Sequence, residues 1–254
     1  MSSFETVANP DGWKPLAQGA LDGIPADVRA RHALDERLFL LAGRRWYAAR
    51  GLDPAEVEAA LEVVGADVGL HLSHFGRPPG KDVWLAWEGL SKIKHLSFNG
   101  AFLGAKGWEA FHATHRLGAL QTLDLSVCDI GLKGLKLLKT SNEMPALEEL
   151  YLGANTDYDR TQKAVAALLS ETKKEPIGAS LRGLEVLGLL FWQLCEAMPA
   201  LEQSAIVQGL RRLWITDRYY ADHRHQSNVA ALPASLQAKC VVGWEQTPIS
   251  MVAR

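Results

Sequence analysis

Histidine, cysteine and carboxylate side chains are the groups in this sequence that could bind a metal ion or transfer protons. The histidines include three close pairs: His71 with His74, His112 with His115, and His223 with His225. A zinc site needs three or four ligands, and none of these pairs is accompanied by the cysteines or carboxylates that typically complete one. Asp222 beside the third pair makes that pair the strongest candidate, but a solvated loop is the simpler interpretation. We therefore predict no metal site.

Other motifs that could carry chemistry are incomplete. Residues 76–82 (GRPPGKD) resemble a phosphate-binding loop, but the Gly–Lys spacing is wrong and Asp82 stands where Ser or Thr would hold magnesium. No residue stands in a recognised nucleophile motif such as G-x-S-x-G. Glu148 and Glu149 are neighbours in a predicted strand, so their side chains would point to opposite faces. We predict no cofactor and no enzymatic activity; an enzyme whose catalytic residues come together only on folding is an alternative.

The composition is typical of a folded globular protein without a strong net charge. Hydrophobic residues make up 48% and charged residues 22% of the 254 residues, far from the profile of a disordered chain. The formal net charge is -2, so the chain does not have the excess of basic residues by which proteins bind nucleic acids or anionic membranes. We therefore predict neither a nucleic-acid nor a membrane partner.

Cysteine usage and the N-terminal sequence favour a cytoplasmic location. Cys128, Cys195 and Cys240 are odd in number and widely spaced, which fits a reducing compartment. The first residues are acidic and polar where a secretory signal has a basic start and an apolar run. No stretch approaches the roughly 20 uninterrupted apolar residues of a membrane span. Delivery by an unrecognised export route is left open.

The strongest pattern is an L-x-x-L-x-L spacing of apolar residues that recurs from Ile93 onward. It occurs in five segments: Ile93–Phe98, Leu120–Leu125, Leu147–Leu152, Leu184–Leu189 and Leu210–Ile215. Their middle leucines follow one another at intervals of 27, 27, 37 and 26 residues. Leu70 lies 26 residues before the first middle leucine, and Val241 lies 28 residues after the last. The sequence thus predicts six or seven repeated units.

This spacing resembles the leucine-rich-repeat family, whose consensus has an asparagine or cysteine five positions after the middle leucine. Cys128 and Asn155 occupy that position. The other clear copies carry different residues there: Ala101, Trp192 and Arg218. The period resembles the longer, helix-containing repeats of ribonuclease-inhibitor-like proteins. The resemblance implies an α/β solenoid over roughly residues 67–245, with a curved parallel sheet on the concave face and helices on the convex face.

The segments between the predicted strands have helical apolar spacing, so each unit is expected to be a strand, a turn and a helix. These segments are residues 104–117, 131–144 and 161–174. Stacked units would bury their leucines in one continuous core. The long interval of 37 residues implies an insertion, for which the sequence favours a loop at Glu171–Ser180 that contains Pro176 and Gly178.

The N-terminal residues 1–66 are predicted to form a helical cap that covers the apolar end of the stack. Pro25 marks a helix start, and Leu34–Leu41 carries a helical apolar stripe. Asp53 and Glu56 have the spacing of a capping box, which predicts a second helix there. A separate adaptor domain is the alternative for this segment. Residues 246–254 are predicted to form a C-terminal tail.

Strand side chains alternate, so the positions between the leucines are predicted to form an exposed binding face. The early strands carry small polar residues there, whereas the later strands carry the aromatic and charged types that dominate binding energy at protein interfaces. Trp214 and Tyr151 are the predicted anchors. The other predicted contacts are His95, Asp124, Glu149, Leu190, Trp192, Arg212, Tyr219 and Tyr220.

The function that these patterns favour is recognition of another protein through the concave face, by a chain that is monomeric when free. An inhibitor of an enzyme or toxin, such as an immunity protein, is the most concrete version, and it rests on the family resemblance. An adaptor or secreted effector whose N-terminal helices recruit a second protein is the alternative.

Overall fold

In the computed structural model, ten strands of the described residues form one sheet, and their order in the sheet follows the sequence. The residues that the structure describes are 14–16, 19–41, 44–65, 67–72, 80–101, 103–114, 116–153, 165–171, 176–190, 198–216 and 232–243. Within these, the backbone alone is described for residues 14–15, 41, 190, 198–200, 214–216 and 241–243.

The sheet is mostly parallel, so the chain belongs to the α/β class. Its strands are β1 (Lys14–Pro15), β2 (Leu38–Leu41), β3 (Arg44–Ala48), β4 (Gly69–His71), β5 (His95–Ser97), β6 (Thr122–Asp124), β7 (Glu149–Tyr151), β8 (Val186–Leu190), β9 (Arg212–Thr216) and β10 (Cys240–Gly243). The pairs β1–β2 and β2–β3 are antiparallel, and every neighbouring pair from β3 to β10 is parallel.

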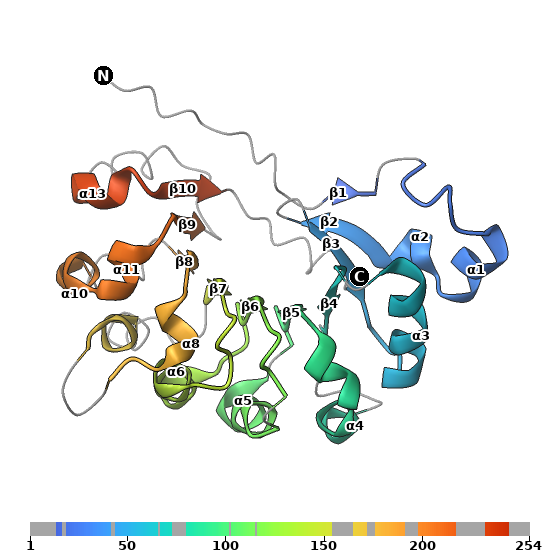
Figure 1. Ribbon diagram of the computed structural model, residues 1–254, viewed down its shortest axis with the longest axis horizontal. Helices are drawn as coiled ribbons and strands as arrows, with labels where there is room; N and C mark the ends of the chain where they lie inside the picture. The colour runs from blue at the N-terminus through green and yellow to red at the C-terminus, as the bar shows by residue number, and fades with distance from the viewer. Residues whose placement is uncertain are drawn as a thin grey trace.

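The helices after β3 lie on the outer side of an arc whose inner side is lined by the strands (Figure 1). The helices are α1 (Ala26–Arg31), α2 (Leu34–Arg37), α3 (Pro54–Val64), α4 (Lys81–Ala86), the 3-10 helix η1 (Glu88–Lys92), α5 (Gly104–His112), α6 (Gly131–Thr140), α8 (Ala179–Arg182), α10 (Met198–Gln203), α11 (Ala205–Gly209) and α13 (Ala234–Gln237). No helix in the described ranges is both long and apolar enough to cross a bilayer.

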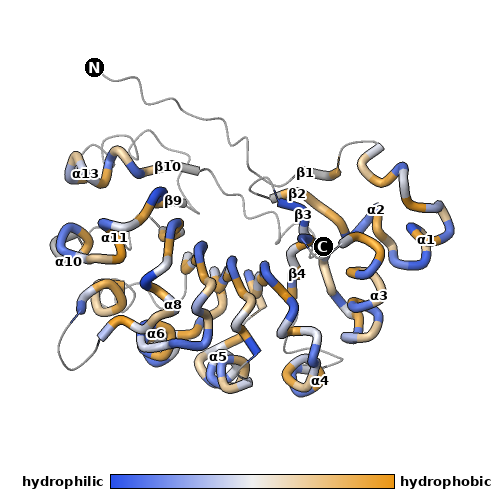
Figure 2. Tube along the Cα trace, viewed as in Figure 1, coloured by the Kyte–Doolittle hydropathy of each residue, from blue (hydrophilic) through white to orange (hydrophobic). Residues whose placement is uncertain are grey.

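The middle leucines of the repeated segments form a single row across the sheet, as the sequence predicts. Each pairs with the next in register, and all are at most 1% exposed: Leu70, Leu96, Leu123, Leu150, Leu187 and Leu213. Apolar and polar positions accordingly alternate along β5 to β7 (Figure 2). The leucines therefore face the helices, and the intervening side chains lie on the opposite face.

The prediction that Val241 continues this row is wrong by one residue. Cys240 is the residue that pairs with Leu213, while Val241 pairs with Trp214. Cys240, Val241 and Val242 are all apolar, so alternation along the chain could not choose between the two registers.

The N-terminal segment is only partly helical, which corrects the prediction for Leu34–Leu41. Ala33 has φ 48 between α1 and α2, and the helical stripe ends at Arg37. Residues Leu38–Leu41 then pair with β3 as a hairpin. The reason is that this run is apolar on both sides of a strand: Leu38 joins the main core, while Phe39 packs in a second cluster with Trp46 and Ala48. Two apolar residues four positions apart, such as Leu34 and Leu38, can lie on one face of a helix or on one face of a strand.

The predicted capping box at Asp53 is confirmed. The Glu56 backbone N–H donates to Asp53 Oδ1 over 2.9 Å, and the Asp53 N–H donates to Glu56 Oε2 over 2.8 Å. The helix α3 begins at the following Pro54, which needs no amide donor in the first turn. The N-terminal segment thus combines one well-capped helix with a hairpin that extends the sheet.

The helices predicted between strands are present as α5, α6 and a helical stretch at residues 165–169. In the last of these, Val165, Leu168 and Leu169 are buried, which agrees with the helical apolar spacing of residues 161–174. Within the predicted Glu171–Ser180 loop, residues 176–178 are irregular and α8 begins at Ala179. The long interval therefore contains an additional short helix as well as a loop.

Candidate binding surface on the inner face of the sheet

The candidate surface, here called the inner face, is the side of the sheet turned away from the core. Its described side chains form two registered rows across the strands. One row contains His95, Thr122 and Glu149, and the other contains His71, Ser97, Asp124 and Tyr151. The predicted alternation therefore places these residues on one face, with side chains from adjacent parallel strands within contact distance.

The inner-face side chains of β4 to β6 are buried, which corrects the prediction that they form an open polar surface. His95 is 6% and Asp124 is 7% exposed, and the other polar residues of β4 to β6 are similarly covered. Glu149, Tyr151 and Arg212 are partly exposed. Alternation along a strand determines the face on which a side chain lies, but burial depends on what else packs there.

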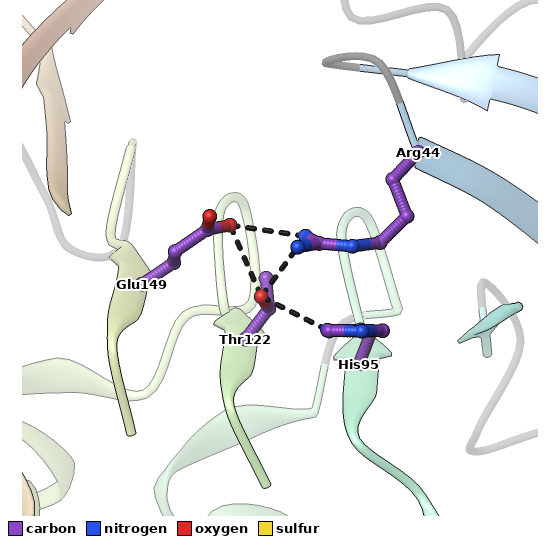
Figure 3. A network of polar contacts seen from close by, with 4 residues as sticks. All are labelled: Arg44, His95, Thr122 and Glu149. Atoms are coloured by element: carbon purple, nitrogen blue, oxygen red, sulfur yellow. Dashed lines mark hydrogen bonds and ion pairs between the residues drawn. The ribbon is translucent and has the colours of Figure 1, made fainter. Parts of the chain in front are cut away.

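The hydroxyl of Thr122 is the centre of the first network (Figure 3). It donates to Glu149 Oε2 over 3.0 Å and accepts from Arg44 Nη1 over 3.0 Å. The ring nitrogen Nδ1 of His95 lies 3.1 Å from the same oxygen. A hydroxyl has one hydrogen and two lone pairs, and the hydrogen is used by Glu149. His95 Nδ1 must therefore carry a hydrogen and donate it.

Arg44 completes this network from a distant part of the chain, and no sequence pattern had pointed to it. It begins β3 and also donates from Nη1 to Glu149 Oε2 over 3.0 Å, across 105 positions of sequence. The curvature of the sheet brings β3 toward β7 (Figure 3). Arg44, Trp46 and Ala48 occupy alternate positions, which place them on one face of β3. That placement could have indicated Arg44, but no strand was predicted for this segment.

Burial lowers the pKa of His95 to about 4, and the positive charge of Arg44 adds to this effect. The imidazole is therefore neutral near pH 7, in agreement with the single hydrogen that its Nδ1 donates to Thr122. A neutral ring also avoids placing a second positive charge beside the Arg44 guanidinium.

The lowered pKa of His95 predicts that the protein loses stability as pH falls from about 6.5 toward about 4. In that window the unfolded chain binds a proton at His95 and the folded chain does not, so protonation favours unfolding. Relative to His95→Gln, the wild type should lose about 2 kcal/mol of unfolding free energy between pH 7 and pH 5. Urea titrations of both proteins at each pH measure this difference, and parallel pH profiles would contradict the shifted pKa.

Asp124 is the acceptor of a second network, which is fully buried. Its carboxylate accepts hydrogen bonds from Ser97 Oγ at 3.1 Å, Asn99 Nδ2 at 3.3 Å and the Ser126 N–H at 2.8 Å. Burial raises the pKa of Asp124, and these hydrogen bonds oppose the rise by stabilising the charged form. The carboxylate thus holds together side chains from two strands and the turn that follows.

The direction of the hydrogen bonds shows what this second network does. His71 Nδ1 lies 3.1 Å from Ser97 Oγ, and the one hydrogen of Ser97 points to Asp124, so the histidine donates to the serine. In a catalytic triad the histidine accepts the proton of the serine, which is the opposite direction. In this arrangement the His71–Ser97–Asp124 chain orients side chains from three adjacent strands.

The buried Cys128 joins two neighbouring segments of the chain by a hydrogen bond. Its thiol donates to the carbonyl of Phe98, in the preceding unit, over 3.0 Å. A second contact joins it to the Ser126 carbonyl at 3.4 Å. Burial raises the pKa of this thiol well above its usual value. Cys128 therefore acts as a hydrogen-bond donor between neighbouring turns, and Ile130 after it is also buried.

Strands β7 and β9 carry the predicted contacts that are partly exposed to solvent. Tyr151 on β7 is partly exposed, and its ring lies so close to Gly188 on β8 that any side chain there would overlap it. Arg212 on β9 is also partly exposed. The backbone of Trp214 and Leu190 lies in β9 and β8, but their side chains are outside the described residues. Trp192, Tyr219 and Tyr220 lie outside the described residues entirely.

The candidate metal and phosphate motifs are mostly outside the described residues as well. His74, His115, His223 and His225 belong to this group, as do residues 76–79. Across the ranges that the structure does describe, no three His, Cys, Asp or Glu residues are grouped as a metal site would require. Lys81 and Asp82 of the glycine-rich motif lie in the first turn of α4.

No protein-family model matches this chain, and a comparison with curated proteins found no significant match. The family suggested by the leucine spacing therefore stays a prediction. The geometry of the inner face is the remaining guide to function.

Proposed function

We propose that the chain is a leucine-rich-repeat solenoid that recognises a partner protein through the inner face of its sheet. Three features support this fold proposal. The strands follow one another in sequence order, the middle leucines pair in register, and Cys128 joins successive turns through the Phe98 carbonyl. Each strand with its helix leaves its leucines uncovered until the next unit stacks on it.

The observation that carries the functional proposal is that the inner face has both buried and partly exposed side chains of interacting types. On β5 and β6 the side chains are buried and bonded to one another. On β7 and β9, Glu149, Tyr151 and Arg212 are partly exposed, while Val186 on β8 between them is buried. Arginine and tyrosine contribute strongly to binding energy when a partner covers them, and rigid strands reduce the entropy lost on binding.

Neutralisation of the partner, as an inhibitor or immunity-type protein does, is the most concrete form of this proposal, and it rests on the family resemblance. We place this activity in the cytoplasm, where thiols stay reduced. Neither Cys128 nor Cys240 is part of a disulfide, which agrees with that compartment. The partner in this proposal is a protein and not a nucleic acid.

The proposal predicts that Tyr151→Ala weakens partner binding by about thirtyfold, equivalent to about 2 kcal/mol for an aromatic side chain at the centre of an interface. The partner is first captured from a lysate with the wild-type chain and identified by mass spectrometry. Titration calorimetry with the purified partner then gives the dissociation constant of each variant.

Leu132→Ala is the matched control, because Leu132 is 47% exposed on α6, on the helical side of the sheet. It should leave the dissociation constant unchanged. Equal weakening by both variants, or by Leu132→Ala alone, would place the interface elsewhere. Trp214→Ala in the same series tests the second anchor that the sequence predicts.

A further inference from the structure

The ion pair between Arg44 and Glu149 gives the inner face a specific chemistry. We infer that Thr122 and Glu149 form a binding site for an arginine of the partner, which Arg44 occupies while the protein is free. This inference rests on the proposed function, since it assigns part of the same inner face. It adds that the recognised group is a guanidinium and that the contact between Arg44 and Glu149 must open before the partner binds.

The acceptor side of this site is fixed before any partner arrives. Thr122 and Glu149 are paired in register on adjacent strands, and the Thr122 hydroxyl donates to Glu149 Oε2. His95 holds the same hydroxyl from the other side. The three side chains therefore keep their orientation whether or not Arg44 is in place, and such preorganisation favours binding of a further group.

Arg44 uses the site incompletely. Only its Nη1 takes part, and it meets only Oε2 of Glu149, whereas the strongest arginine–carboxylate pairs form two parallel hydrogen bonds. Among the described residues, no hydrogen bond joins Oε1 of Glu149 or the other two nitrogens of Arg44 to another group. An arginine that approaches from solvent is free to reach both carboxylate oxygens.

The exposure of the pair makes displacement feasible. The side chains of Arg44 and Glu149 are 25% and 21% exposed, so the site can be approached from solvent. Arg44 also stands at the start of β3, opposite Leu41 at the end of β2, so its side chain can turn away without breaking the middle of the hairpin.

The charge of the site selects the incoming group. If a neutral side chain displaced Arg44, the partly buried Glu149 carboxylate would lose its only cationic contact among the described residues, which is costly. A cation replaces that contact without any change in net charge. The two acceptor residues suit a guanidinium better than an ammonium, because the planar fork can reach two acceptors at once.

The test uses Nα-acetyl-arginine methylamide as the probe, with the chain followed by amide NMR. The wild type should bind the probe weakly, because Arg44 competes for the site. Arg44→Ala should bind it at least fivefold more tightly, with shifts centred on residues 122–124 and 149–151. The matched control is Arg45→Ala, since Arg45 is exposed and adjacent; it should behave as the wild type does.

Further variants make the result decisive. Glu149→Gln in the Arg44→Ala background should abolish the gain, whereas Glu148→Gln should preserve it, because Glu148 is an exposed neighbour outside the network. If Arg44→Ala does not give a folded amide spectrum, Arg44→Gln replaces it. Absence of tighter binding in the folded variant would overturn the inference, as would a gain that survives Glu149→Gln. Equal binding of the acetyl-lysine analogue would overturn the choice of arginine.

Failure of this inference and failure of the proposed function give different results. Probe binding that depends on Glu149, together with partner binding that is insensitive to Tyr151→Ala, would support the arginine site and contradict the proposed interface. The reverse outcome would support the interface and leave Arg44 as a structural contact only.

Discussion

Asp124→Ala is expected to lower the free energy of unfolding by about 4 kcal/mol. The carboxylate accepts hydrogen bonds from Ser97, Asn99 and the Ser126 backbone, all of them buried. Removing the acceptor leaves three donors without a partner in a site closed to water, and each such group costs about 1–3 kcal/mol. Urea denaturation followed by circular dichroism gives the unfolding free energies of both proteins.

Asp124→Asn is the informative comparison for this experiment. The amide keeps an oxygen that can accept at least one of the three hydrogen bonds, so its loss of stability should be clearly smaller than that of Asp124→Ala. Asp67→Ala is the surface control, because Asp67 is exposed in a turn and pairs with Lys94. An Asp124→Ala variant as stable as the Asp67→Ala control would show that the network contributes nothing to the fold.

Gly178→Ala is expected to cost about 3 kcal/mol, because the backbone of another segment fills the place of its side chain. A Cβ at Gly178 would lie 2.7 Å from the carbonyl carbon of Thr140 and 2.8 Å from that of Ser141, with the Ser141 oxygen closer still. Backbone atoms cannot turn aside as a flexible side chain can, so the start of α8 would have to move away from the end of α6.

Several hydrogen bonds oppose that movement. Gly178 N–H donates to the Lys139 carbonyl over 2.7 Å, and Ser180 N–H donates to the Ser141 carbonyl over 3.1 Å. Ser180 Oγ also accepts from the Met144 N–H over 3.0 Å. A shift of α8 would stretch all three contacts. Thermal and urea unfolding of Gly178→Ala therefore measure the strength of this junction.

Gly183→Ala is the matched control, because Gly183 stands at the other end of the same helix. The nearest atom to its Cβ would be the Leu147 carbonyl oxygen at 3.7 Å, an ordinary contact distance. Its φ of -90 also suits alanine. The control should change stability by less than about 1 kcal/mol. Similar losses for both variants would mean that helix propensity, and not the contact with α6, determines the effect.

The local elements with strong signals could be predicted from the sequence. The capping box at Asp53 defines the start of α3 because both of its hydrogen bonds lie within four residues. The row of buried leucines from Leu70 to Leu213 follows from a spacing that repeats in the chain. Cys128 could likewise be assigned its place in a turn from that spacing. These features depend on contacts between residues close in sequence or on a spacing that repeats regularly along the chain.

The hairpin β2–β3 and the register of β10 could not be predicted in the same way. The run Leu38–Leu41 is apolar on both faces, so its period is consistent with a helix or a strand. Its partner strand, which supplies Trp46, decides between them by forming the second apolar cluster. At Cys240 the neighbouring valines make both registers equally apolar, and pairing with β9 decides which is used.

For β4 to β9, the sequence by itself determined which face each strand side chain occupies, because alternation is a property of the extended backbone. Only the tertiary structure decided which of those side chains are buried and which groups they meet. In a flat sheet, β3 and β7 would be about 19 Å apart, as four spacings of about 4.8 Å require. No arginine side chain spans that distance, so the contact of Arg44 with Glu149 depends on the curvature of the whole sheet.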